Sequence, residues 1–164
     1  HARKAILKGL SPRDNLRIPK LNYGIVKQIK DNNPNLEIII NGGITKTDEI
    51  KEHLNNVDGV MIGRASIGYP WIFREIRHYL TTGKKLDPPT ITERVDMCRA
   101  HFIKSIEWKL GRLGIFEMRR HYSNYFKGLD HFKDYRTQLV TSESVEEIHH
   151  ILDEVKDRYE SLLQ

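Results

Sequence analysis

The sequence predicts a parallel α/β region followed by a region made only of helices. Two β-branched runs, residues 36–41 and 58–63, end in or next to glycine and have the apolar character of buried parallel strands. A stretch with helical spacing follows each run, so strand and helix alternate with short connections, as in α/β folds. After residues 83–89, which hold a glycine and two prolines, no strand pattern recurs.

The two helices of the α/β region are expected over residues 45–55 and 69–80, the first with Ile50 and Leu54 on one face. Two strands can neither close a barrel nor bury both faces of a sheet, so the remaining strands would have to precede His1. We therefore expect the chain to be the carboxyl-terminal part of a longer protein, in keeping with a first residue that is not methionine.

The helical region is expected to begin at a capping box, because Thr90 and Glu93 stand three residues apart at the start of an apolar helical stripe. The stripe consists of Val95, Cys98, Phe102 and Ile106. Three more helices are expected, over residues 115–126, 131–139 and 144–163. We therefore divide the chain into an α/β domain, residues 1–82, and a helical domain, residues 83–164.

The composition, with 38% hydrophobic and 30% charged residues, is that of a soluble globular protein. No apolar run approaches the ~20 residues that cross a membrane and no signal-peptide pattern is present, so we expect a cytoplasmic protein with no membrane partner. A single cysteine, Cys98, excludes an internal disulfide framework and a cysteine-based zinc cluster. Redox chemistry would therefore need a cofactor, and we expect no metal site and a monomer.

The net charge of +5 is unevenly distributed along the chain. Residues 1–20 carry six Lys or Arg against one acid, and residues 101–136 carry eight against four, whereas the tail from Glu143 is acidic. Basic zones beside an acidic helix are typical of proteins that bind a polyanion on one side. Ordinary solvated charged faces would give the same pattern, so charge alone leaves the partner open.

Two strand ends carry the residues of a phosphate site. Asn41, Gly42 and Gly43 follow the first strand, and Gly63 and Arg64 follow the second. Backbone amides approach a phosphate closely only where side chains are absent, and an arginine adds charge and a fork of donors. Loops after the seventh and eighth strands of (β/α)8 barrels commonly build such a site. Glycines that merely make tight turns remain an equal alternative.

Several sequence motifs occur together and in the order expected of one protein family. In the α/β region they are His1-Ala2-Arg3-Lys4-Ala5, Lys8-Gly9-Leu10-Ser11-Pro12, Ile40-Asn41-Gly42-Gly43-Ile44 and Asp58-Gly59-Val60-Met61-Ile62-Gly63-Arg64. In the helical region they are Glu117-Met118-Arg119-Arg120-His121-Tyr122 and Asn124-Tyr125-Phe126-Lys127-Gly128. The chain thus resembles the tRNA-dihydrouridine synthases over essentially its whole length. It looks most like the A-type members up to about residue 64 and more like the B-type members after it.

The resemblance implies a flavin enzyme that reduces uridine in tRNA to 5,6-dihydrouridine, with FMN as cofactor and NADPH as reductant. It implies the last strands and helices of a (β/α)8 TIM barrel followed by an all-helical, tRNA-binding domain. The cofactor residues carried over by motif are His1, Asn41, Gly42, Gly43, Gly63 and Arg64. The family's catalytic acid is a cysteine expected upstream, so we name no catalytic residue in this chain. Cys98 stands in an apolar helical stripe, where a cysteine is core and burial raises its pKa.

The RNA-binding residues that the resemblance implies are polar, all but one of them basic, and lie in both regions. They are Arg3, Lys4, Lys8, Arg119, Arg120, Asn124 and Lys127. Tyr122 and Tyr125 interleave with the last four, and a helix would place Arg120, Asn124 and Lys127 on one face. The alternative is that these tyrosines are core and that the arginines pair with acids such as Glu117.

Two other functions remain open on the sequence. A flavin barrel that acts on a small molecule would carry the same phosphate loops, although a broad cationic surface would serve it little. A non-catalytic RNA-binding module would carry the same basic residues and would retain no flavin.

Overall fold

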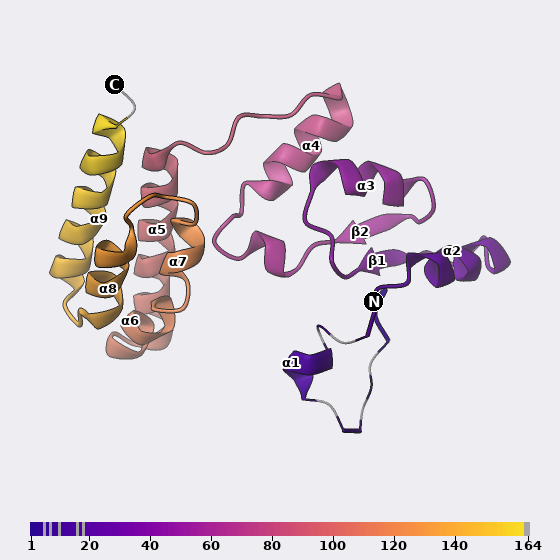
Figure 1. Ribbon diagram of the computed structural model, residues 1–164, viewed down its shortest axis with the longest axis horizontal. Helices are drawn as coiled ribbons and strands as arrows, with labels where there is room; N and C mark the ends of the chain where they lie inside the picture. The colour runs from indigo at the N-terminus through magenta and orange to yellow at the C-terminus, as the bar shows by residue number, and fades with distance from the viewer. Residues whose placement is uncertain (5, 7, 10, 16, 18, 163–164) are drawn as a thin grey trace. The chain divides into compact units, whose positions relative to one another are not determined.

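The computed structural model describes residues 1–4, 6, 8–9, 11–15, 17 and 19–162. Ala5 and Leu10, which belong to the motifs above, lie outside these residues. The chain forms two compact units. The first unit comprises His1–Ser66 and Trp71–Leu86, and the second comprises Ile67–Pro70 and Asp87–Gln164. Helices and a small parallel sheet make up the described chain (Figure 1).

The first unit is built on two short parallel strands, β1 (Ile39–Asn41) and β2 (Gly59–Met61), in which Ile40 pairs with Val60. Helix α3 (Thr47–Leu54) connects them. The strands are shorter than predicted; before β1, the Ile38 amide donates to the Asp58 carboxylate at 2.8 Å instead of to a strand neighbour. The unit also contains α1 (Pro12–Asn15), α2 (Tyr23–Asn32), the 3-10 turn η1 (Arg64–Ser66) and α4 (Ile72–Thr82). The sequence had not predicted α2.

The core of the first unit lies on one face of this sheet. Ile40 packs there with Ile50 of α3, and these side chains are 3% and 2% exposed. The opposite face carries Ile39 and Met61, which are 60% and 53% exposed. Leu54 is 36% exposed, so of the two apolar residues predicted to share a face of this helix only Ile50 is buried.

The described part of the second unit contains no strand. Its elements are α5 (Ile91–Lys109), α6 (Arg112–Met118), α7 (Tyr122–Tyr125), α8 (Lys133–Thr141) and α9 (Val145–Ser161). The predicted capping box is present, since the Thr90 hydroxyl accepts from the Glu93 amide and the Glu93 carboxylate accepts from the Thr90 amide. Its predicted apolar stripe is core as well: Val95, Cys98 and Phe102 are completely buried, and Ile106 is half-buried.

The helix predicted over residues 115–126 is interrupted. α6 ends at Met118 and α7 begins at Tyr122, with a turn between them. Within the turn the Arg119 amide donates to the Phe116 carbonyl and the His121 amide to the Met118 carbonyl, three residues back instead of four. Residues 120, 124 and 127 therefore do not share one continuous helix. Within the described ranges, no helix combines the length and apolar composition that crossing a membrane requires.

Candidate functional site

A hollow of about 530 Å³ opens where β1 and β2 end. Parallel strands bring their carboxyl ends to the same edge of the sheet, so the loops that follow them are neighbours. The hollow brings together every residue that the sequence predicted for the cofactor. Its lining is His1, Asn41, Gly42, Gly43, Ile44, Thr45, Met61, Gly63, Arg64 and Ala65.

His1 borders the hollow beside the loop that follows β1. The Ala2 amide donates to the Asn41 carbonyl at 2.8 Å, which fixes this segment at the end of β1. The His1 ring packs on Gly42: a Cβ atom at Gly42 would lie 2.7 Å from ring carbon Cε1. The Arg3 amide donates to Nδ1 of His1 at 3.0 Å, so in the neutral ring the proton is on Nε2. Nε2 can therefore act as a hydrogen-bond donor.

The loop after β1 needs its glycines for the fold itself. Gly42 and Gly43 have φ angles of +116° and +72°, in the left-handed region that favours glycine. A Cβ atom at Gly43 would lie 2.3 Å from Cδ1 of Leu21. Tight-turn geometry, the alternative that the sequence left open, therefore accounts for both glycines without any ligand.

The loop after β2 is different. Gly63 has no left-handed φ angle, and a Cβ atom there would meet no protein atom within 4 Å. Its carbonyl accepts from the amide and the hydroxyl of Ser66, which closes a tight turn. The Arg64 side chain is exposed, and no ion pair to it occurs within the described part of the chain. Backbone and guanidinium donors thus stand at the hollow beside open space.

Two residues that the sequence analysis missed hold the loop after β1. The Tyr23 hydroxyl donates to the Gly42 carbonyl at 2.7 Å. The Glu49 carboxylate accepts from the amides of Thr45 and Lys46 at 3.1 and 3.3 Å. Glu49 is the third residue of α3, so a capping signal could have identified it. No local pattern indicates Tyr23, because its partner lies 19 residues away.

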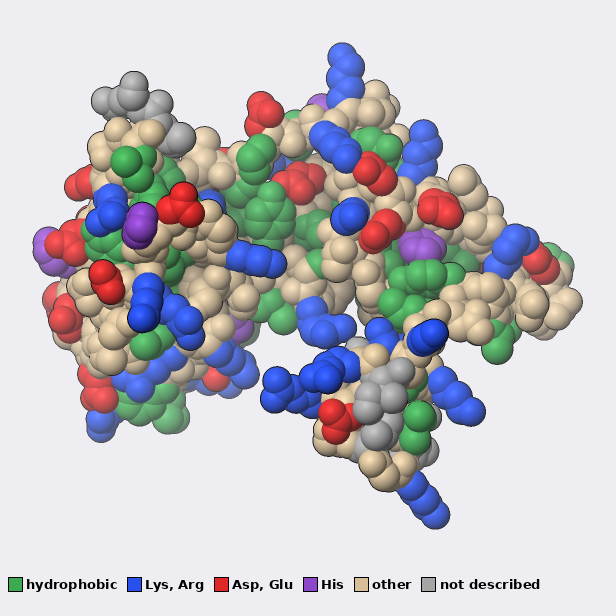
Figure 2. Space-filling view, in the orientation of Figure 1, with side chains coloured by type: hydrophobic (Ala, Val, Ile, Leu, Met, Phe, Trp, Pro, Cys, Tyr) green, Lys and Arg blue, Asp and Glu red, His purple; other side chains and the backbone are tan. Residues whose placement is uncertain are grey.

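The basic residues near the amino terminus differ in what they contact. Arg3 donates to the carbonyls of Pro19 and Arg17, so its guanidinium ties two backbone segments together. Lys4 and Lys8 are exposed and, within the described ranges, form no ion pair. Lys and Arg side chains project from the segment around α1 with few acids between them (Figure 2).

The four predicted RNA residues of the second unit also differ. Arg119 is half-buried, stacks 4.4 Å from the Phe116 ring centroid, and lies 3.7 Å from the Glu143 carboxylate. Arg120 is exposed and pairs with Glu117. Asn124 and Lys127 are exposed side chains on and just after α7.

Tyr122 and Tyr125 interleave with these residues in the sequence but do not accompany them on the surface. Their side chains are 0% and 5% exposed and belong to the core of the second unit. Burial raises the pKa of Tyr125 to about 12, and the Tyr125 hydroxyl is in contact with Nδ1 of His101 at 3.0 Å. The alternative interpretation, tyrosines in a helical core and Arg120 paired with Glu117, describes these contacts.

A family model described as "Dihydrouridine synthase (Dus)" matches residues 1–160. The chain belongs to the dihydrouridine synthase family. The tRNA-dihydrouridine(20/20a) synthases of Haemophilus ducreyi and Salmonella typhi are 40% and 38% identical to it, each over 85% of the chain. The Synechocystis sp. relative of the same name is 52% identical over 48% of the chain. The chain spans less than half the length of these curated relatives, namely 42%, 41% and 25%.

Cys98 is a core residue, as predicted. Its side chain is completely buried on α5, and burial raises the pKa of its thiol far above the usual value. A buried thiol with a raised pKa stays protonated and is out of reach of a substrate, so it is unsuited to nucleophilic or acid catalysis.

Proposed function

We propose that this chain is the carboxyl-terminal part of an FMN-dependent enzyme that reduces uridine in tRNA to 5,6-dihydrouridine, with NADPH as reductant. Family membership and the names of the relatives support the reaction. The observation that supports FMN as the cofactor is the hollow at the ends of β1 and β2. His1, both glycine-bearing loops and Arg64 meet there. When bound, FMN would supply the hydride for the uracil ring.

The fold that we propose around the hollow is a (β/α)8 barrel, with β1 and β2 as its last two strands. Ile39 and Met61 are apolar and largely exposed on the sheet face opposite α3, which is the face that the interior of a barrel would bury. The Ala2 amide bonds to the Asn41 carbonyl on β1, where a preceding parallel strand would end. We propose domains at residues 1–82 and 83–164; the two compact units differ from these only around residues 67–70 and 83–86.

The residues at the hollow fit the phosphate and the ring of a flavin. Backbone amides at Gly42, Gly43 and Gly63 would donate to the phosphate, and the Arg64 guanidinium would balance its charge. The open space at Gly63 is compatible with close approach of an anion. Nε2 of His1 would donate to a carbonyl of the flavin or of the target uracil.

The acid that protonates the reduced uracil would come from outside this chain. Cys98 is buried in the second unit and unsuited to the role. We therefore propose that the catalytic cysteine lies upstream and that the chain alone is inactive. The cytoplasm is the proposed location, and a monomer the proposed state.

For tRNA we propose contacts from both units. Lys4, Lys8, Arg120, Asn124 and Lys127 are exposed and suit phosphate contacts. Arg3 and Arg119 remain in the proposal, although each also contacts another group of the protein. Arg3 donates to the Pro19 carbonyl, and Arg119 pairs with Glu143. We place the target uridine at position 20 or 20a, on the names of the relatives.

The test uses a full-length protein that carries this chain as its carboxyl-terminal part. After gentle purification it should be yellow, release FMN on denaturation, and form dihydrouridine in unmodified tRNA when NADPH is supplied. Sequencing or mass mapping of the product tRNA then checks position 20 or 20a. A yellow protein indifferent to tRNA would favour a small-molecule oxidoreductase, and a colourless tRNA-binding protein would favour an RNA-binding module.

A further inference from the structure

Tyr23, the first residue of α2, contacts the loop that follows β1. Its hydroxyl donates to the Gly42 carbonyl at 2.7 Å. A Cβ atom at Gly43 would lie 3.0 Å from the same hydroxyl and 2.3 Å from Cδ1 of Leu21. The loop therefore rests directly on Leu21 and Tyr23, which leave no room for a side chain.

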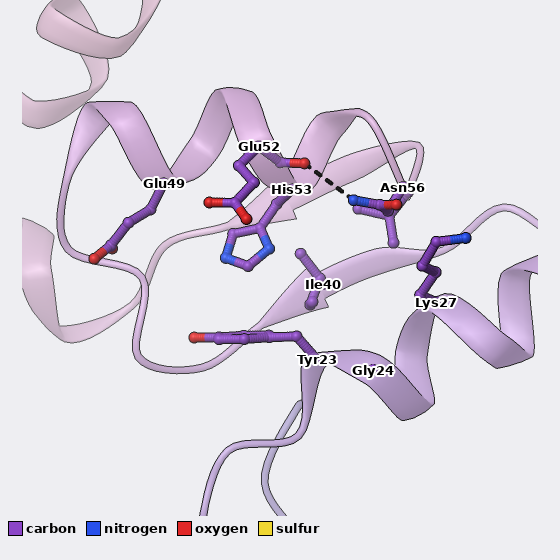
Figure 3. A pocket seen from close by; sticks show the side chains of 9 residues that line it. Tyr23, Gly24, Lys27, Ile40, Glu49, Glu52, His53 and Asn56 are labelled. Atoms are coloured by element: carbon purple, nitrogen blue, oxygen red, sulfur yellow. Dashed lines mark hydrogen bonds between the residues drawn. The ribbon is translucent and has the colours of Figure 1, made fainter.

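The Tyr23 ring is itself held in place. It lies beside the His53 ring of α3, with centroids 4.4 Å apart, and both rings line a second hollow together with Ile40 (Figure 3). Burial, followed by the charge of Glu49, raises the pKa of Tyr23, so its hydroxyl keeps the proton that it donates. The preceding residue, Asn22, donates its amide to the Ala2 carbonyl at 2.7 Å.

The hydrogen bond from Tyr23 to the Gly42 carbonyl also determines the direction of the next N–H group, that of Gly43. The Gly42 carbonyl and the Gly43 N–H belong to one peptide plane and point in opposite directions, and the described chain has no cis peptide bond. A hydroxyl that fixes the carbonyl on the Tyr23 side turns the Gly43 N–H away from Tyr23. At the other end of the loop, Glu49 occupies the amides of Thr45 and Lys46. The amide of Gly43 is thus set apart from those that the fold already uses.

We propose that Tyr23 is a positioning residue for the cofactor phosphate: by fixing the Gly42 carbonyl, its hydroxyl aims the Gly43 N–H at the phosphate in the hollow. This inference rests on the proposed function, because it takes the hollow to be the FMN phosphate site. Tyr23 does not line that hollow, so its action is indirect. Its effect should therefore depend on the presence of a phosphate in the ligand.

Tyr23→Phe in the full-length protein tests this, because it removes the hydroxyl and keeps the ring against His53. We expect the dissociation constant for FMN to rise about 3- to 10-fold, as loss of one hydrogen bond predicts, and that for riboflavin, which lacks the phosphate, to stay unchanged. Fluorescence titration of the apoprotein with both ligands measures the two constants. Tyr79→Phe on α4, a half-buried tyrosine that does not line the hollow, is the matched control and should change neither.

The outcomes separate this inference from the proposed function. An equal loss of affinity for FMN and riboflavin would mean that Tyr23 only supports the fold. No loss of affinity for either ligand would mean that the hydrogen bond to Gly42 contributes nothing to FMN binding. Both results would overturn the inference. If the parent protein itself bound FMN no better than riboflavin, or bound neither, the phosphate site would be lost and the inference with it.

Discussion

The two loops that border the hollow differ in how much the fold itself demands of their residues. After β1, Gly42 and Gly43 have left-handed φ angles and no space for a Cβ atom, so the fold requires glycine there. After β2, Gly63 has neither constraint, and Arg64 projects without an ion pair among the described residues. A glycine that the fold does not need is the better indicator of a ligand. The second loop is therefore the place to test the cofactor site.

Gly43→Ala should have the largest effect, and on stability. The left-handed φ angle and the overlap with Leu21 should together lower the free energy of unfolding by about 2–4 kcal/mol. Gly83→Ala is a matched control, because Gly83 has the same φ of +72° but open space around it, and should cost only about 1 kcal/mol. Urea unfolding of the full-length protein measures both, and equal losses would show that packing against Leu21 is unimportant.

Arg64→Ala should act on the ligand and leave stability unchanged. Without the charged guanidinium at the phosphate, FMN binding should weaken on the order of 10- to 100-fold. Retention of FMN after dilution, followed by absorbance, measures this. Arg77→Ala, an exposed arginine on α4, is the control. Unchanged flavin occupancy in the Arg64 variant would remove this residue from the site.

Gly63→Ala tests the comparison of the two loops most directly. Because a Cβ atom at Gly63 meets no protein atom, the free energy of unfolding should change by less than about 0.5 kcal/mol. FMN binding should nevertheless weaken by about 10-fold if the phosphate approaches this backbone closely. Unfolding and flavin titration of one preparation give both values. A variant that binds FMN as the parent does would place the phosphate elsewhere.

The cations of the second unit differ in exposure: Arg120 and Lys127 are exposed, whereas Arg119 is half-buried. Lys127→Ala, combined with Arg120→Ala, should weaken tRNA binding and flatten its dependence on salt by about one unit of slope for each RNA phosphate that is no longer neutralised. Arg119→Ala should in addition lower stability, because Arg119 packs on Phe116 and pairs with Glu143. Binding at several salt concentrations, with FMN content as control, separates the two. Identical salt slopes in variant and parent would exclude these residues from the RNA face.

Predictions based on neighbouring residues agreed with the structure where the deciding contacts are local. The Thr90–Glu93 capping box forms between residues three apart, and the buried stripe of α5 follows from helical spacing. The same reasoning failed at residues 119–121, where an uninterrupted helix was expected. Whether Tyr122 and Tyr125 face solvent or core depends on the turn at that point and on the helices packed around it.

The sequence by itself determined that glycines and an arginine follow two neighbouring strands, because these residue types stand at the ends of two β-branched runs. Parallel pairing then had to bring those ends together, since it aligns the carboxyl ends of both strands. Only the tertiary structure decided which glycines the fold requires, and that Tyr23 and Glu49 hold the first loop from two different helices. Those contacts join residues that are far apart in the sequence, so no periodic pattern predicts them. Strand ends and helix caps, in contrast, depend on residues that are neighbours in the sequence.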